Sequence, residues 1–159
     1  MSEDAARPRR RWPRRLALGL GLCLLLAQLI RPARTNPPEQ GSAPLDGADA
    51  HTRLVLERAC LDCHSNRTRW PWYSNVAPVS WLVIHDVNEG RENVNFSEWS
   101  RVSPEERGKL LDESCAEVRE GEMPPFTYGL VHRDAHLDAA DVAAICAWAR
   151  DTGARAASE

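Results

Sequence analysis

The residues best suited to chemistry are two cysteines and a histidine in the segment Cys60-Leu61-Asp62-Cys63-His64. This Cys-x-x-Cys-His spacing is typical of covalent haem attachment. On one helical turn both thiols can reach the two vinyl groups at one porphyrin edge, and the next residue can place its imidazole under the iron. The pattern therefore predicts thioether bonds from Cys60 and Cys63 and a proximal iron ligand at His64.

Two other uses of a cysteine pair fit this sequence less well. A redox-active pair is expected at a strand-to-helix junction, and no convincing strand lies near Cys60. A structural zinc site needs four ligands, whereas Cys115 and Cys146 lie singly and far from the pair. A zinc-stabilised interaction module, which would show no visible absorption, is the alternative without haem.

A second axial ligand is expected if the haem carries electrons. Methionine suits this role because its soft thioether stabilises reduced iron. The chain has two methionines, and Met1 is the initiator. Met123 lies in the segment Gly-Glu-Met-Pro-Pro, 59 residues after His64 (123 − 64). We therefore expect Met123 on the iron, with His85 and His132 as the competing candidates.

The N-terminal residues have the pattern of an export signal. Residues 1–35 hold eight arginines and two acids, for a net charge of +6, and the rest of the chain has a net charge of −9. The arginines precede an apolar run, residues 16–30, in which Gln28 is the one polar residue. Basic residues stay in the cytoplasm, so the remainder is expected to be exported. The acidic remainder also argues against a nucleic-acid partner.

Whether the apolar run is cleaved or retained depends on its length and flanks. Fifteen helical residues span about 22 Å, less than the roughly 30 Å hydrocarbon layer, which favours a cleaved signal peptide. However, no small-x-small cleavage site follows the run, and flanking arginines can snorkel to the interfaces. We expect an uncleaved signal anchor that crosses the bacterial inner membrane once, with the folded domain on the periplasmic side.

The whole chain is expected to divide into five segments. A basic cytoplasmic segment (1–15) and the transmembrane helix (16–30) come first. A Pro/Gly-rich linker (31–49), the domain (50–152) and a tail (153–159) follow. Helices are predicted at about 48–63, 79–88 (ending near Gly90), 104–120 and from 139 onward. A capping box of Ser103 and Glu106, Pro104 at the first position and a stop at Gly121 mark the third. Asp138 is the expected cap of the fourth, and the fold class is all-α.

Cys115 and Cys146 fall on the apolar faces of the third and fourth helices. Two remaining thiols in an oxidising compartment usually pair, so a disulfide between them is expected. Two separate buried thiols acting as small apolar groups are the alternative. The aromatic side chains between residues 70 and 81 are expected to pack around the porphyrin.

Two long segments carry a family resemblance. The block C-L-D-C-H-S-N-R-T-R-W-P-W-Y-S-N-V-A-P-V-S-W, with its continuation to Trp99, and the later G-E-M-P-P-F-T-Y-G-L-V-H resemble the bacterial haem-binding domain family of small cytochrome c-like proteins. The similarity covers residues 16–148. It implies a membrane-anchored, exported, cytochrome c-like helical domain around one covalently attached haem c, with site residues at Cys60, Cys63, His64 and Met123.

Function is expected to be one-electron transfer to a redox protein that the sequence does not name. An enzyme is the less favoured class, because no distal acid–base pair is visible in the sequence. The alternative is a haem-based peroxidase or a sensor of small ligands, in which the sixth position of the iron is open or Met123 is displaced.

Overall fold

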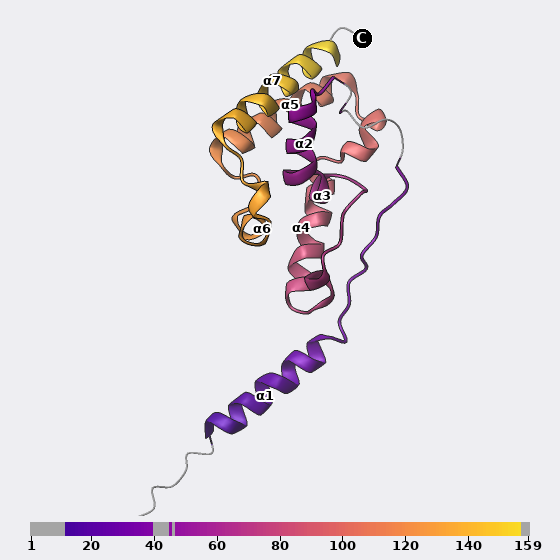
Figure 1. Cartoon of the computed structure of the whole chain (residues 1–159). Helices are drawn as coiled ribbons and strands as arrows, with labels where there is room; N and C mark the ends of the chain where they lie inside the picture. Colours follow the sequence, from indigo (N-terminus) through magenta and orange to yellow (C-terminus); the bar gives the residue numbers. More distant parts are fainter. Residues whose placement is uncertain (1–11, 40–44, 46, 157–159) are drawn as a thin grey trace, which may run out of the picture. The chain divides into compact units, whose positions relative to one another are not determined.

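The computed structural model describes residues 12–39, 45 and 47–156. Its regular elements are seven α-helices and three short 3₁₀ helices, with no strand among the described residues, which confirms the all-α prediction (Figure 1). The α-helices are α1 (Trp12–Ala27), α2 (Ala50–Ala59), α3 (Leu61–His64), α4 (Val79–Asn93), α5 (Pro104–Glu120), α6 (Phe126–Val131) and α7 (Ala139–Ala156). The 3₁₀ helices are η1 (Trp72–Asn75), η2 (Phe96–Arg101) and η3 (Arg133–Ala135).

The chain forms two compact units, and the first combines Met1–Ala33 with Pro71–Ile84. Within this unit the Gln28 side chain pairs with the backbone of Ala77: its Nε2 donates to the carbonyl and its Oε1 accepts from the amide, both at 3.0 Å. Trp81 Nε1 donates to the carbonyl of Ile30 at 2.9 Å. The second unit combines Arg34–Trp70 with His85–Glu159 and contains the Cys-x-x-Cys-His segment.

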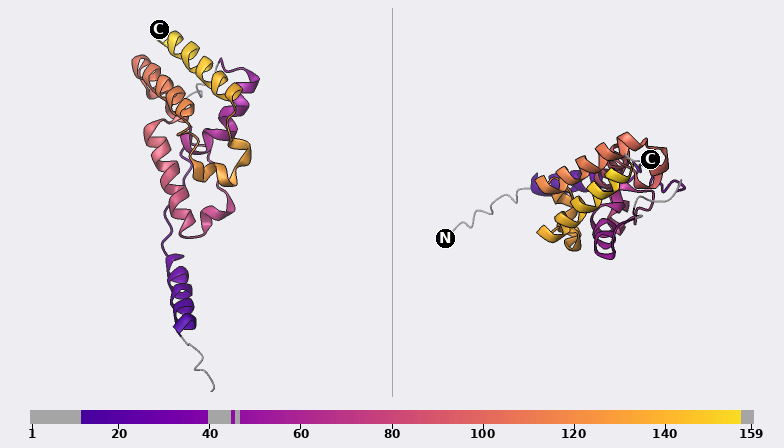
Figure 2. Two further views of the ribbon diagram at one scale, coloured as in Figure 1. Left: turned by 90° about the vertical axis from the view of Figure 1, so that its left-hand side faces the viewer. Right: turned by 90° about the horizontal axis from the view of Figure 1, so that it is seen from above.

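The core of the second unit is built around α5 and α7, which lie side by side (Figure 2). Leu111 and Val118 from α5 are buried together with Ile145 and Trp148 from α7. The i, i+7 spacing of the two α5 residues places them on one face of the helix. Side chains of α2 and η2 complete this core; they are Val55, Leu56, Phe96 and Trp99.

The ends of the two long helices follow their capping residues. Ser103 Oγ accepts a hydrogen bond from the Glu106 amide at 3.3 Å, and Pro104 is the first residue of α5. Gly121 ends α5 at φ 78°, a left-handed conformation that glycine adopts without steric cost. Asp138 caps α7 by accepting from the Asp141 amide at 2.8 Å. Both predicted starts and the predicted end of α5 are confirmed.

Two boundaries differ from the sequence prediction. The first predicted helix is broken at Cys60, whose φ of −123° separates α2 from α3. α4 continues through Gly90 to Asn93 because Gly90 packs against another segment instead of ending the helix. α7 runs to Ala156 and includes Gly153, where an added Cβ would be 3.7 Å from Gly108 Cα. α6 was not predicted.

The N-terminal segments are described in part. α1 ends at Ala27, three residues before the end of the apolar run, and none of its described side chains is buried. Among the described residues, no helix combines the length and the apolar character needed to cross a membrane. Residues 31–39 of the predicted linker have no regular structure. Residues 1–11 of the basic segment, 40–44 and 46 of the linker, and 157–159 of the tail lie outside the described residues.

Candidate functional site: the Cys-x-x-Cys-His turn

The three predicted attachment residues lie on one short turn that begins where α2 ends. The carbonyl of Cys60 accepts from the amides of Cys63 at 3.1 Å and His64 at 3.0 Å. Both thiols are free and half-buried. Burial raises the pKa of Cys60 to about 12 and that of Cys63 to about 11, with the nearby Asp86 carboxylate adding to the second shift. This is opposite to the lowered thiol pKa of a redox-active pair.

His64 is oriented by a hydrogen bond to the end of α4. Its Nδ1–H donates to the carbonyl oxygen of Val94 at 3.1 Å. This bond fixes the tautomer and leaves the Nε2 lone pair available to a metal ion, as is usual for metal-binding histidines. Burial also lowers the pKa of His64, which favours the neutral form that binds metals. The imidazole is therefore prepared for ligation through Nε2.

Close packing of α4 against the turn depends on Gly90. A Cβ added at this position would lie 2.9 Å from the carbonyl oxygen and 3.1 Å from the Cβ of Cys63. Because Val94 follows Gly90 by one helical turn, the close approach places the Val94 carbonyl within reach of His64. Sequence reasoning interpreted Gly90 as a helix stop and missed this role.

The loop after His64 is fixed by Arg91, which also comes from α4. Arg91 Nε donates to the Ser65 carbonyl and Nη2 to Thr68 Oγ1, each at 2.8 Å. Asn95 Nδ2 donates to Asn66 Oδ1 at 2.9 Å. These polar side chains bind loop atoms and so hold the chain on the C-terminal side of His64.

Part of the predicted linker binds to this loop. Arg91 Nη1 donates to the Thr35 carbonyl at 2.8 Å, and Trp70 Nε1 donates to Asn36 Oδ1 at 3.1 Å. Glu39 forms an ion pair with Arg67 at 2.8 Å. The described residues 35–39 are thus bonded to the rest of the second unit, of which they are part.

Met123 and Cys60 are brought to the same core. Met123 follows the left-handed Gly121, and its amide donates to the Glu117 carbonyl at 3.3 Å. Its half-buried side chain packs against the core cluster that Cys60 also contacts.

The two histidines that compete with Met123 have other contacts. His85 is exposed on α4, with Nε2 3.5 Å from Glu89 Oε2. With Asp86, these two side chains place three potential ligand atoms within 4.8 Å of one another. The ring of His132 stacks on Tyr128 with centroids 4.1 Å apart.

Asp62, between the two cysteines, is the centre of a hydrogen-bond network that sequence reasoning missed. Its Oδ1 accepts from the amide of Arg69 at 3.0 Å and from Arg69 Nε at 3.2 Å. Its Oδ2 accepts from Arg69 Nη2 at 3.2 Å and from the phenol of Tyr128 at 3.1 Å. Burial, followed by the Asp62 charge, raises the pKa of Tyr128, so the phenol is a proton donor at neutral pH. No sequence signal links Asp62 to Tyr128, 66 residues later.

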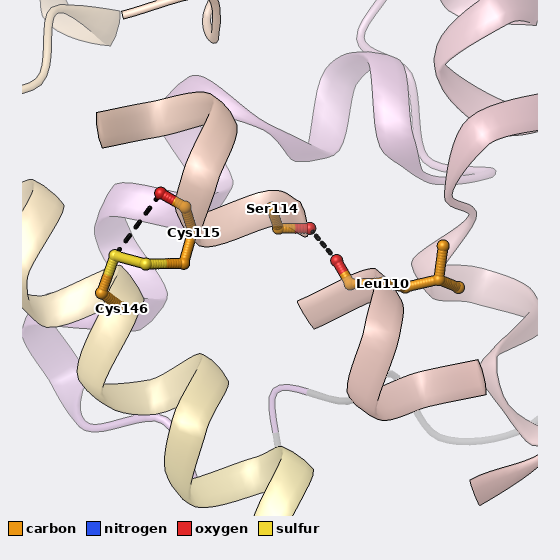
Figure 3. The surroundings of a disulfide bond; sticks show 4 residues. All are labelled: Leu110, Ser114, Cys115 and Cys146. Carbon is orange, nitrogen blue, oxygen red and sulfur yellow. Dashed lines mark hydrogen bonds between the residues drawn. A yellow bond between two sulfur atoms is a disulfide. The ribbon is translucent and has the colours of Figure 1, made fainter. Parts of the chain in front are cut away.

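Cys115 and Cys146 form a disulfide that joins α5 to α7 (Figure 3). The two sulfur atoms are 1.97 Å apart and the Cα atoms 4.9 Å apart. Cys146 Sγ also lies 3.6 Å from the Cys115 carbonyl. The bond fastens the helix that leads to Met123 to the last helix of the unit.

Comparison with known proteins identifies the family. A sequence model of the haem-binding domain family matches residues 22–151. The chain belongs to this haem-binding domain family. No curated protein and no solved structure matches it significantly.

The residues of this haem-binding domain suit the cofactor. Two thiols and a neutral imidazole with a free Nε2 lie on one turn, which is a donor set for a haem iron and a porphyrin edge.

Proposed function

We propose that the chain is an exported c-type cytochrome that carries electrons through one covalently attached haem. The observation that carries the proposal is the hydrogen bond from His64 Nδ1 to Val94, in a Cys-x-x-Cys-His turn of a haem-binding domain. In this proposal Cys60 and Cys63 hold the porphyrin edge as thioethers and His64 binds the iron through Nε2. When bound, the haem supplies a one-electron couple between ferric and ferrous iron.

Met123 is the proposed sixth ligand. Its placement in a proline-stiffened segment against the same core as Cys60 supports this role. A thioether ligand favours ferrous iron and therefore a relatively high reduction potential, which suits an electron carrier. By occupying the sixth position, Met123 would also keep small molecules off the iron.

Absorption spectra of the purified full-length protein, oxidised and reduced, test this assignment. Covalently attached haem should remain with the protein after acid–acetone extraction, and full extraction would refute the attachment. The oxidised protein should be low-spin with a near-infrared sulfur-to-iron band. Met123→Ala should abolish that band, lower the potential and admit cyanide or carbon monoxide. Met123→His should restore low-spin iron at a lower potential.

Histidine variants and ligand binding separate the alternatives. If Met123→Ala leaves the oxidised spectrum unchanged while His85→Ala or His132→Ala produces high-spin iron, the sixth ligand is that histidine. If wild-type iron is already high-spin and binds small ligands readily, the haem peroxidase or sensor class replaces the electron carrier.

Membrane attachment through the N-terminal segment is part of the proposal. The leucines of residues 16–26 are 45–70% exposed on a helix without buried side chains, which suits a lipid environment. The apolar part of α1, residues 16–27, spans about 18 Å, so snorkelling of Arg14 and Arg15 at its start and of Arg31 beyond its end would be needed to match a bilayer. Carbonate-washed membranes should retain a chain whose mass begins near Met1. A soluble species beginning after about Ile30 would show cleavage instead.

This topology would place the haem domain on the periplasmic side, where a redox protein partner would meet it. Capture of binding proteins on the intact holoprotein would identify that redox partner.

A further inference from the structure

We infer that Tyr128 is a positioning residue, which holds the segment carrying Met123 against the haem-attachment turn through its hydrogen bond to Asp62. This inference rests on the proposed ligation of iron by Met123. It assigns to Asp62, the third residue of the Cys-x-x-Cys-His motif, a role in retaining Met123, which lies 61 residues later in the sequence (123 − 62).

The first step of the argument is that Asp62 is a rigid acceptor. Its side chain is 13% exposed, and three donors of Arg69 hold both of its oxygens within 3.0–3.2 Å. The backbone carbonyl of Asp62 also accepts from Thr68 Oγ1 at 2.7 Å. Because Cys60 and Cys63 flank it, the carboxylate has a fixed place relative to the attachment turn.

The second step is that Tyr128 connects α6 to this acceptor. Its phenol donates to Asp62 Oδ2 at 3.1 Å, while its ring stacks on His132 from the end of the same helix at an interplanar angle of 9°. A carboxylate acceptor makes this hydrogen bond stronger than a neutral one. α6 is a short helix of six residues with Phe126 and Leu130 largely exposed, and only Gly129 is buried. The bond to Asp62 is therefore a strong polar contact that joins this helix to the turn, and the more distant Arg58 carbonyl, 3.5 Å from the phenol, is the other acceptor within reach.

The third step is that docking α6 also fixes Met123. Tyr128 follows Met123 by five residues, and two of the four residues between them are Pro124 and Pro125. Proline locks φ near −65°, so the short connection has little freedom. On the other side, Met123 continues from α5, which the disulfide joins to α7. The methionine segment is therefore held at one end by the disulfide-linked pair of helices and at the other by the Tyr128–Asp62 bond.

Competition between Met123 and added imidazole for the ferric iron of full-length holoprotein measures this role. Tyr128→Phe keeps the ring and its stacking but removes the hydroxyl. Loss of a hydrogen bond to a charged acceptor should raise the apparent affinity for imidazole about tenfold or more. Thr127→Val is the matched control: it removes a hydroxyl from an exposed residue of the same helix and should leave the affinity at the wild-type value.

A double-mutant cycle separates this role from a general loss of packing. Asp62→Asn keeps an acceptor oxygen but removes the charge, so it should raise the apparent affinity for imidazole less than Tyr128→Phe does. In the Asp62→Asn background, Tyr128→Phe should raise that affinity by a smaller factor than in the wild type. Additive effects would overturn the inference, as would equal imidazole affinities of wild type and Tyr128→Phe. If Tyr128→Phe does not accumulate as holoprotein, Asp62→Asn alone tests the inference. An imidazole affinity of Asp62→Asn equal to that of the wild type then overturns it. A wild-type protein without the sulfur-to-iron band refutes the proposed ligation and this inference together, and that result is seen before any variant is made.

Discussion

Gly90→Ala should destabilise the protein even though alanine is the better helix former. In the interior of a helix, replacing glycine with alanine stabilises the helix by about 1 kcal/mol. At Gly90, however, the new methyl group would lie 2.9 Å from the carbonyl oxygen of Cys63. That oxygen belongs to the backbone of the Cys-x-x-Cys-His turn, so no side-chain rotation can relieve the clash.

Gly108→Ala in α5 provides the matched control. Its new Cβ would have no neighbouring atom within 4 Å, so this variant should gain about 0.4–1 kcal/mol. The helix-propensity gain is common to both variants and cancels in the comparison. The difference in the free energy of unfolding should then equal the overpacking cost at Gly90, about 1–3 kcal/mol.

Chemical denaturation followed by circular dichroism at 222 nm measures both variants. Because Gly90 also lets Val94 reach His64, the Gly90→Ala protein should carry less haem per chain, measured by haem staining on a denaturing gel against total protein. Equal unfolding free energies for the two variants, or a Gly90→Ala protein with a full haem content, would refute the packing argument.

Three further predictions concern the scaffold. Replacing Cys115 and Cys146 by alanine should cost about 3–4 kcal/mol, the chain-entropy value for a sequence separation of 31, seen as a lower denaturation midpoint in the absence of reductant. Asp141→Ala removes the buried carboxylate whose Oδ2 is 2.5 Å from Arg58 Nη2, and leaving that guanidinium with backbone acceptors but without its carboxylate partner should cost about 3 kcal/mol in thermal unfolding. The Asp141 amide lowers the pKa of the Asp138 carboxyl. The ionised Asp138 carboxylate therefore stabilises the fold at a pH above its pKa in the unfolded chain. This stabilisation is lost as the pH falls through the lower pKa of the folded protein. Asp138→Asn should therefore make the free energy of unfolding less dependent on pH in the acid range.

Local signals allowed the two long helices to be predicted. Ser103, Pro104 and Gly121 specify the limits of α5 by satisfying backbone groups within a few residues, and Asp138 does the same for the start of α7. Such capping needs no knowledge of the rest of the fold. The pairing of Cys115 with Cys146 could be expected for a similar reason, because each falls on the apolar face of its own helix.

Long-range contacts determine the features that were not predicted. Gly90 has the residue type of a helix stop, yet its function is to let α4 approach Cys63, a contact between residues 27 positions apart in the sequence. The break at Cys60 likewise does not follow from helix propensity. The Pro-rich composition of residues 31–39 indicated a free tether, but Arg91, Trp70 and Arg67 bind its described end.

The chemistry and the geometry of the site therefore come from different ranges of the sequence. The donor atoms of Cys60, Cys63 and His64 lie within five residues, so their chemistry can be predicted from a short motif. Their orientation depends on Val94, which is 30 residues from His64, and on Tyr128, which is 66 residues from Asp62. Because α3 has four residues and cannot hold its own shape, these distant contacts determine which way the imidazole and the thiols face. Substitutions outside the motif are thus expected to alter haem attachment as strongly as many substitutions beside it.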